Sequence, residues 1–253
     1  MSYAIVFSSK TGNTALLAQT LQEQLPQADC ILLPLPLEQA DLPLAQLLGM
    51  AKPGALALGG KVTDSARTIA RAAGVELVDY FARPELTVYN AIPTAEGCIG
   101  ILLERRSRTL WGAAVLVLGF GPVGRALAVR LAALGARVTV AARRPVQRAM
   151  AEELGLRAVS LTDLAAAAAA FDTVVNTIPA PVLTTQVLAA LPKGSLIVDL
   201  ASKPGGTDFA AARRLGHTAL HALSLPTVWA PETAGEALAR TVQTILQERE
   251  EKI

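Results

Sequence analysis

The sequence has little cysteine and no long apolar segment. Its two cysteines, Cys30 and Cys98, are too few for the disulfide framework of a secreted protein, and 253 residues can bury a core without such cross-links. The longest apolar run, residues 110–124, ends at Arg125 and is too short to span a membrane. The start MSYAIVF lacks the regions of a signal peptide. These absences predict a cytoplasmic protein without a membrane segment.

A strong charge of one sign is also missing. The chain has 23 Lys and Arg residues against 21 Asp and Glu, and its two tryptophans, three tyrosines and five phenylalanines do not alternate with basic residues. Surfaces that bind nucleic acid need a basic stripe. We therefore expect no nucleic-acid partner and a small molecule as the ligand.

Short Val- and Leu-rich runs separated by helical stretches make up most of the chain. Buried strands are predicted at residues 115–118, 138–140, 173–176 and 196–199, and helices at 125–134, 145–154, 162–170 and 184–191. Strands that alternate with helices indicate βαβ units and a parallel sheet. The predicted fold class is α/β, with a doubly wound parallel-sheet Rossmann domain.

The first third of the chain repeats this alternation and predicts a smaller, flavodoxin-like α/β domain. Strands are predicted at 4–7, 30–33, 55–58 and 76–79, with helices at 14–25 and 63–73 and a further segment at 42–50. Residues 89–93 carry turn signals, and Thr94 would cap a helix that ends near Arg106. We expect residues 1–92, completed by a C-terminal helix at about 231–253, to form a substrate-binding catalytic domain, and residues 93–230 to bind the cofactor.

A GxGxxG motif, GFGPVG at residues 119–124, follows the strand VLVL and precedes a helix. Gly119 would make the tight turn, Gly121 would let the backbone approach a pyrophosphate, and Gly124 would allow close packing of helix and strand. The pyrophosphate would lie at the helix N-terminus. The alternative is a glycine-rich turn with a structural role only. We assign to cofactor binding Gly119, Gly121, Pro122, Val123 and Gly124.

The end of the next strand selects between nicotinamide cofactors. NAD is recognised there by an acidic residue that binds the ribose 2′-hydroxyl, but this chain has Ala142, Arg143 and Arg144. Two guanidinium groups are suited to the 2′-phosphate of NADP. They could also form a solvated pair on the surface. We predict NADP as the cofactor, with NAD as the alternative.

Two further loops follow buried strands, at the sheet edge where α/β proteins bind ligands. The loop at residues 176–179 begins with an amide that could contact the cofactor or a neighbouring loop. The loop at 199–208 carries Ser202 and Lys203, where a group near the nicotinamide is expected, although the glycine pair at 205–206 could simply turn the chain. We assign to cofactor binding Asn176, Thr177, Ile178, Pro179 and Ala201.

Five segments resemble the dipicolinate synthase A family. They are YNAIPTAEG at 89–97, VLVLGFGPVGRALA at 115–128, VNTIPAPVL at 175–183, IVDLASKPGGTDF at 197–209 and LPTVWAPETAG at 225–235. The resemblance implies an NADP-dependent oxidation and dehydration of cyclic 4-hydroxy-tetrahydrodipicolinate to dipicolinate for endospore formation. It also implies a small dicarboxylate substrate and, as a partner, the flavoprotein-like second component of the synthase, dipicolinate synthase B; we expect a homo-oligomer as well.

Two segments depart from the family. Residues 9–14, SKTGNT, look like the phosphate loop of flavodoxins and could bind FMN, hold a substrate or phosphate group, or form a structural turn, which we favour; we expect no FMN. Near the end of the Rossmann part, His221, Ser224 and Thr227 stand where the family has apolar residues and glycine.

The implied reaction removes water and two electrons from a ring with two carboxylates, and so needs a proton donor. Lys203 could anchor a carboxylate or act as the acid, with Ser202 and Asn90 as hydrogen-bond partners. Glu96 is the candidate carboxylate for proton transfer, although a carboxylate at a helix start can serve the helix dipole alone. Weaker candidates are Thr94, Thr207 and Asp208.

Other reactive side chains give no site. His217 and His221 flank a strand-like segment and would lie roughly 13 Å apart, too far to share a metal ion, so we expect no metal. Cys98 has no histidine base nearby in the sequence. Two other functions stay open: another NADP-dependent dehydrogenase of small carboxylates, of hydroxyacid or shikimate type, and a non-catalytic NADP-binding protein of a larger complex.

Overall fold

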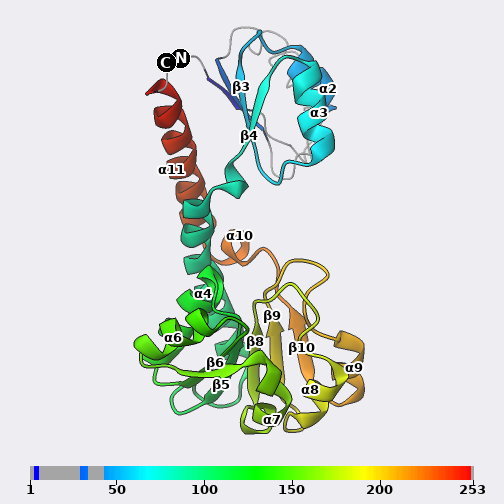
Figure 1. Ribbon diagram of the computed structural model, residues 1–253, viewed down its shortest axis with the longest axis vertical. Helices are drawn as coiled ribbons and strands as arrows, with labels where there is room; N and C mark the ends of the chain where they lie inside the picture. Colours follow the sequence, from blue (N-terminus) through cyan, green and yellow to red (C-terminus); the bar gives the residue numbers. More distant parts are fainter. Residues whose placement is uncertain (1–2, 6–28, 34–42, 252–253) are drawn as a thin grey trace. The chain divides into compact units, whose positions relative to one another are not determined.

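The computed structural model describes residues 3–5, 29–33 and 43–251, and the chain divides into two compact units (Figure 1). The first unit comprises residues 1–87 and 237–253, and the second comprises residues 88–236. Each contains one parallel sheet, which confirms the predicted α/β class. Two helices, α4 (Pro84–Arg105) and α11 (Pro231–Glu250), run across the boundaries between the units. That one unit binds substrate and the other cofactor stays a prediction.

The described part of the first unit has parallel strands in the order β1-β2-β3-β4. These strands are β1 (Tyr3–Ile5), β2 (Cys30–Leu32), β3 (Leu56–Gly59) and β4 (Glu76–Asp79), and the helices on one face are α2 (Leu44–Gly49) and α3 (Asp64–Ala72). The other face packs against the 3-10 helix η3 (Tyr80–Ala82), the start of α4 and residues 237–246 of α11. Among the described strands the first lies at the end of the sheet, whereas flavodoxins place it between the second and third.

The sheet of the second unit has six parallel strands in the order β10-β9-β8-β5-β6-β7. These strands are β5 (Ala114–Leu118), β6 (Arg137–Ala142), β7 (Arg157–Ser160), β8 (Thr173–Asn176), β9 (Leu196–Asp199) and β10 (Thr218–His221). Counted from β5, this is the strand order of the Rossmann fold, which reverses direction between β5 and β8. Ligands of such sheets bind outside the carboxyl ends of the strands at that reversal.

Helices cover both faces of this sheet. The remaining helices of the unit are α5 (Pro122–Ala133), α6 (Pro145–Glu153), η4 (Leu161–Asp163), α7 (Leu164–Ala167), η5 (Ala168–Ala170), α8 (Thr185–Ala190), α9 (Phe209–Arg214) and α10 (Leu225–Trp229). Val115 and Val117 of β5 pack with α4 and α5, while Leu116, one residue along, packs on the opposite face with α7 and α8. Full burial of each such side chain contributes about 1.5–3 kcal/mol. The sheet is therefore buried on both faces, as its Val-rich strands predict.

Residues 89–93 form part of a helix and not a turn. Helix α4 has 22 residues and begins at Pro84, so Pro93 and Thr94 lie in its interior, and the predicted helix start at Thr94 is wrong. Pro84 suits the first helical position because its fixed φ and missing N–H cost nothing there. The Thr94 hydroxyl donates to the carbonyl of Asn90 at 2.6 Å, inside the helix. Local turn signals are here outweighed by the packing of the helix as a whole.

That packing also explains the apolar composition of α4. Among the described residues, it is the one helix long and apolar enough to cross a membrane by length and composition alone. Its residues Ala95, Cys98 and Leu102 are fully buried in the core of the second unit. Burial in this core accounts for these three apolar residues, whereas Val88 and Leu103 of the same helix are exposed.

Candidate functional site

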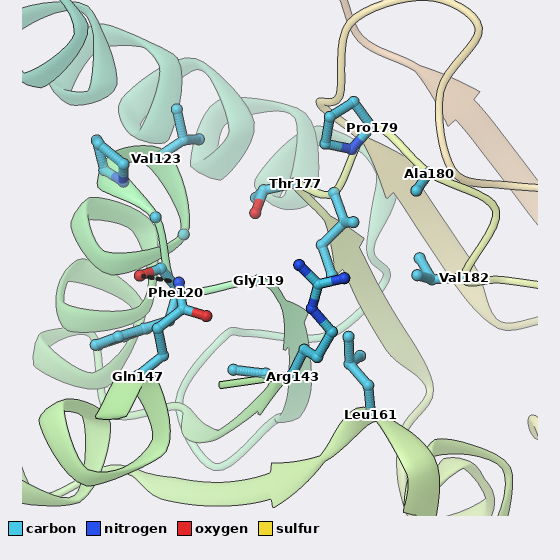
Figure 2. Close-up of a pocket in the computed structure, with 15 residues that line it drawn as sticks. Gly119, Phe120, Val123, Arg143, Gln147, Leu161, Thr177, Pro179, Ala180 and Val182 are labelled. Atoms are coloured by element: carbon cyan, nitrogen blue, oxygen red, sulfur yellow. Dashed lines mark hydrogen bonds between the residues drawn. The ribbon is translucent and has the colours of Figure 1, made fainter. Parts of the chain in front are cut away.

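A cavity of about 440 Å³ lies at the carboxyl ends of β5, β6 and β8 in the second unit (Figure 2). This volume is within the range of small-molecule sites. The cavity is lined by the glycine loop after β5, the end of β6 and the loop after β8, with one residue each from α6 and η4. The lining residues are 119–124, Ala142, Arg143, Gln147, Leu161, 177–180 and Val182. The cavity therefore lies at the reversal of strand order, where the fold predicts a ligand.

Each glycine of the GFGPVG loop has a distinct environment. Gly119 has a left-handed φ of 94°, and a Cβ there would lie 2.4 Å from the Thr177 hydroxyl oxygen. A Cβ on Gly124 would lie 2.2 Å from the carbonyl oxygen of Gly119. A Cβ on Gly121, by contrast, would meet nothing within 4 Å. Gly119 and Gly124 are therefore required by the fold, whereas Gly121 leaves room beside the cavity for a ligand.

The N-terminus of α5 lies at the same cavity. This helix begins at Pro122, earlier than the predicted start at Arg125, because proline is well suited to the first helical position. Gly121 is the N-cap and offers no side chain to the first turn. The first N–H groups of a helix have no acceptor within the helix, and with the helix dipole they favour an anion. Since Pro122, Val123 and Gly124 line the cavity, the geometry fits a pyrophosphate.

The structure separates the two arginines at the end of β6. Arg143 lines the cavity, and its guanidinium points toward Thr177 (Figure 2). Arg144 is the N-cap of α6, is exposed and does not line the cavity. Arg148 donates from Nη1 to the carbonyls of Ala142 and Arg143, each at 3.0 Å, and so holds the backbone at the strand end. One of the two predicted arginines therefore reaches the cavity.

Some lining residues were not predicted. The Gln147 side chain donates to the carbonyl of Phe120 at 3.3 Å and links α6 to the glycine loop (Figure 2). Leu161, directly after β7, also lines the cavity. Val182 completes the wall formed by the loop after β8. The placement of Gln147 one helical turn after Arg144 could have suggested it, but Leu161 and Val182 reach the site only through the tertiary fold.

Asn176 is buried behind the cavity and does not line it. Its amide nitrogen donates to the Ile178 carbonyl and to Asp199, each at 3.0 Å, and its oxygen accepts from the Ile178 N–H at 3.0 Å. Of the two possibilities for this amide, the structure shows contact with neighbouring loops. Ala201 is also buried and outside the lining. The roles of Asn176 and Ala201 in cofactor binding stay predictions.

The predicted catalytic residues do not line the cavity. Ser202 and Lys203 are exposed on the loop after β9. Glu96 is in the middle of α4, not at a helix start, and its side chain is 61% exposed, with Oε1 3.6 Å from Nε of Arg130. Asn90 is half-buried on the same helix. Their catalytic roles therefore stay predictions.

The weaker candidates have structural partners. The Thr207 hydroxyl donates to Asp199 at 2.7 Å. Asp208 caps α9 by accepting from the Ala211 N–H at 2.9 Å, and this backbone hydrogen bond is the main cause of a lowered pKa of its carboxyl. Both side chains thus stabilise the loop that precedes α9.

His217, His221 and Cys98 do not line the cavity. Nε2 of His217 lies 2.9 Å from the Leu188 carbonyl, and Nε2 of His221 lies 2.8 Å from the Ala201 carbonyl. In the part of the chain that the structure describes, no three His, Cys, Asp or Glu side chains are grouped as metal ligands. Burial raises the pKa of the Cys98 thiol to about 12. The predicted phosphate loop at residues 9–14 lies outside the described residues.

Comparisons with known proteins agree with this geometry. Residues 101–202 match the model of the D-isomer specific 2-hydroxyacid dehydrogenase, NAD binding domain. The crystal structure of dipicolinate synthase A from Bacillus subtilis aligns over 100% of this chain and 98% of that chain, with 30% identity and a TM-score of 0.85. The chain belongs to the dipicolinate synthase A family. The resemblance read from the sequence is thereby confirmed.

Other members of the dipicolinate synthase A family give similar matches. The structure of dipicolinate synthase A from Bacillus halodurans has 28% identity and a TM-score of 0.84, and covers 97% of each chain. The curated dipicolinate synthase A sequence of Bacillus subtilis is 41% identical over 180 residues, which are 71% of this chain. The aligned stretch spans 61% of that relative's length.

Membership of this family, together with the match to a dehydrogenase NAD-binding domain, supports an oxidoreductase with a nicotinamide cofactor. The residues of the cavity fit such a group. Gly121 leaves space for the pyrophosphate, and the first turn of α5 offers N–H groups to it. Arg143 lies at the end of β6, the position that contacts the adenosine ribose in Rossmann folds.

Proposed function

We propose that the chain oxidises and dehydrates 4-hydroxy-tetrahydrodipicolinate to dipicolinate with NADP as the electron acceptor. The observation that carries the cofactor proposal is the position of Arg143 in the lining of the cavity at the end of β6, where NAD-specific folds have an acid. The substrate and product are proposed from membership of the dipicolinate synthase A family. The chain would act in the cytoplasm, and its product dipicolinate would serve endospore formation.

The residues of the second unit would divide the recognition of NADP between them. The first turn of α5 would bind the pyrophosphate, with Gly121 leaving the space for it. Arg143 would form charge-assisted hydrogen bonds to the 2′-phosphate, while Arg148 holds the backbone on which Arg143 stands. The bound nicotinamide would accept a hydride.

The chemistry requires the loss of one water and of two hydrogen atoms from the ring. The substrate and NADP⁺ give dipicolinate, water, NADPH and a proton. The leaving hydroxyl needs a proton, and the carbon that gives up hydride must be held in place. Lys203 is the proposed acid or carboxylate anchor, with Ser202 and Asn90 as its hydrogen-bond partners and Glu96 as a second candidate for proton transfer.

The partners follow from the same family. The relatives are named as one component of a synthase with more than one kind of chain, which supports a complex with dipicolinate synthase B. We propose in addition that the chain associates with copies of itself. The partner could complete the site or supply the substrate. The proposal therefore includes dipicolinate synthase B as a component of the assay.

The decisive experiment is an assay of the purified chain, alone and with dipicolinate synthase B, using freshly generated 4-hydroxy-tetrahydrodipicolinate. We expect dipicolinate and NADPH in equal amounts, with NADP⁺ preferred to NAD⁺. Turnover of a hydroxyacid or of shikimate in place of this substrate would instead assign another dehydrogenase activity. Tight NADPH binding without turnover, even with dipicolinate synthase B present, would identify a non-catalytic cofactor-binding protein.

A further inference from the structure

Asp199, the last residue of β9, is fully buried and accepts four hydrogen bonds. One carboxylate oxygen accepts from the Asn176 amide and from the Ala201 N–H, each at 3.0 Å. The other accepts from the Gly206 N–H at 2.8 Å and from the Thr207 hydroxyl at 2.7 Å. A carboxylate offers about four acceptor positions, so both oxygens are fully used.

This arrangement excludes Asp199 as a general acid or base. A carboxylate at the carboxyl edge of a Rossmann sheet is in a suitable region for a general acid or base. Such a group must reach the reacting atom, directly or through one water. Asp199 has no exposed surface, and protein donors occupy both its oxygens. Any effect of Asp199 on cofactor binding or turnover must therefore act through the groups that it holds.

The four donors come from two different loops. Asn176 ends β8 and opens the loop that lines the cavity, whereas Ala201, Gly206 and Thr207 belong to the loop after β9. The carboxylate of Asp199 thus ties the two loops together. The second loop is also the one that carries Ser202 and Lys203.

Gly206 links the loop after β9 to the wall of the cavity. Its carbonyl accepts from the N–H groups of Val182 and Leu183 at 3.0 and 2.9 Å. A Cβ on Gly206 would lie 2.5 Å from the carbonyl oxygens of Ile178 and Ala180, so the two loops are in direct backbone contact. Ile178, Ala180 and Val182 line the cavity, and Figure 2 shows Ala180 and Val182 on the side opposite Phe120 and Gln147.

The position of this wall identifies the part of the cofactor that it serves. A Rossmann sheet consists of two mononucleotide-binding halves. Arg143 belongs to the half formed by β5, β6 and β7, whereas the loops held by Asp199 belong to the half formed by β8, β9 and β10. We infer that Asp199 is a positioning residue that shapes the nicotinamide side of the cofactor site by fastening the loops after β8 and β9 together.

The inference rests on the proposed function only in taking the cavity as the NADP site, and it does not depend on the substrate. It can be tested by comparing a whole cofactor with a fragment. NADPH would contact both halves of the site, whereas adenosine 2′,5′-bisphosphate would contact the Arg143 half alone. The dissociation constants of both ligands can be measured by calorimetry on the full chain.

Thr207 offers the mildest change to the Asp199 contacts. Thr207→Val removes one donor from the carboxylate while keeping the side-chain shape, and Thr207→Ser keeps the hydroxyl. We expect Thr207→Val to weaken NADPH binding by about three- to tenfold. This loss corresponds to part of the free energy of one hydrogen bond to a charged group, because Thr207 acts on the cofactor only through the loops. Binding of adenosine 2′,5′-bisphosphate should change by less than about twofold in the same variant. Thr218→Val, at an exposed threonine of β10, is the matched control and should leave both constants unchanged.

Several results would overturn the inference. Equal weakening of NADPH and the bisphosphate by Thr207→Val would indicate general destabilisation, and unchanged NADPH binding would show that the contact does not shape the site. Failure of Thr207→Ser to restore binding would exclude the hydroxyl as the cause. The Asp199→Asn variant, if folded, should lower turnover without removing a limb of the pH profile; a lost limb would make Asp199 an acid or base.

The failure of the proposed cofactor would be seen separately. A wild-type chain that binds NADH more tightly than NADPH would contradict the proposed cofactor but not the role of Asp199. The dissociation constants of the Thr207 variants would then be measured for NADH and for ADP as its fragment in the same way. Selective weakening of the whole cofactor would again support the inference, and equal weakening would again overturn it.

Discussion

Replacing Arg143 by alanine tests the cofactor proposal most directly. Of the described residues that line the cavity, Arg143 is the one with a charged side chain. A hydrogen bond to a charged group contributes about 1.5–3 kcal/mol, and the exposure of Arg143 places it at the lower end of this range. Arg143→Ala should therefore weaken NADPH by about ten- to thirtyfold and leave NADH within about twofold. Fluorescence titration of the purified chain with both reduced cofactors gives the two dissociation constants.

Arg144→Ala is the matched control for this prediction. Arg144 carries the same charge and adjoins Arg143, but it stands at the N-cap position of α6 and does not line the cavity. Its replacement should change the affinity for either cofactor by less than about threefold. Added salt should reduce the NADPH preference of the wild-type chain, since the guanidinium of Arg143 is exposed and its charge is screened by salt. Equal losses of NADPH and NADH in Arg143→Ala would refute the assignment of the 2′-phosphate to this residue.

The other predictions concern the glycine loop, the proposed acid, the buried thiol and the N-terminal loop. Gly121→Ala should keep the wild-type melting temperature but weaken NADPH, because its Cβ meets open space beside the cavity, whereas Gly124→Ala should lower the melting temperature, because its Cβ would lie 2.2 Å from a backbone oxygen. Lys203→Met should reduce kcat/KM at least about tenfold, roughly 1.4 kcal/mol, with NADPH affinity unchanged, and wild-type efficiency would remove Lys203 from the site. Cys98 should resist a thiol reagent at pH 8 until the chain is unfolded, because burial raises its pKa to about 12; rapid labelling of the native chain would contradict this. Purified protein should be colourless, and stoichiometric flavin would reinstate FMN binding at residues 9–14.

The parts of the fold that the sequence predicts well are those with dense local patterns. Strands β8 and β9 coincide with the predicted ranges because each is a run of residues buried on both faces and bounded by turns. Strand β7, whose residues are exposed or half-buried, carries no such run and was not predicted. Helix α4 was misplaced because Asn90 and Pro93 are turn signals only in a short window, while burial of Ala95 and Leu102 is a property of the whole helix.

The candidate site shows the same division. Gly119 and Arg143 could be assigned from sequence because backbone geometry fixes their spacing along one βαβ unit. Leu161 and Val182 lie far along the chain from the glycine loop, and no local pattern indicates that they share its cavity. The position of Arg144 depended on which residue caps α6, and neighbouring arginines are not distinguished by a motif. Contacts between loops of different strands are set by the tertiary structure and must be read from it.

The continuity of α4 and α11 across the boundaries between the two units limits how the protein can be divided. The boundaries at residues 87–88 and 236–237 lie within these helices, where no loop offers a site for cutting or for joining foreign sequence. A fragment that starts at residue 88 would lose the first turn of α4 and its start at Pro84, and one that ends at residue 236 would keep only the first residues of α11. Short helical remnants are marginal in water without their packing partners. Recombination between relatives, in evolution or in the laboratory, would therefore have to place its crossover points outside both helices.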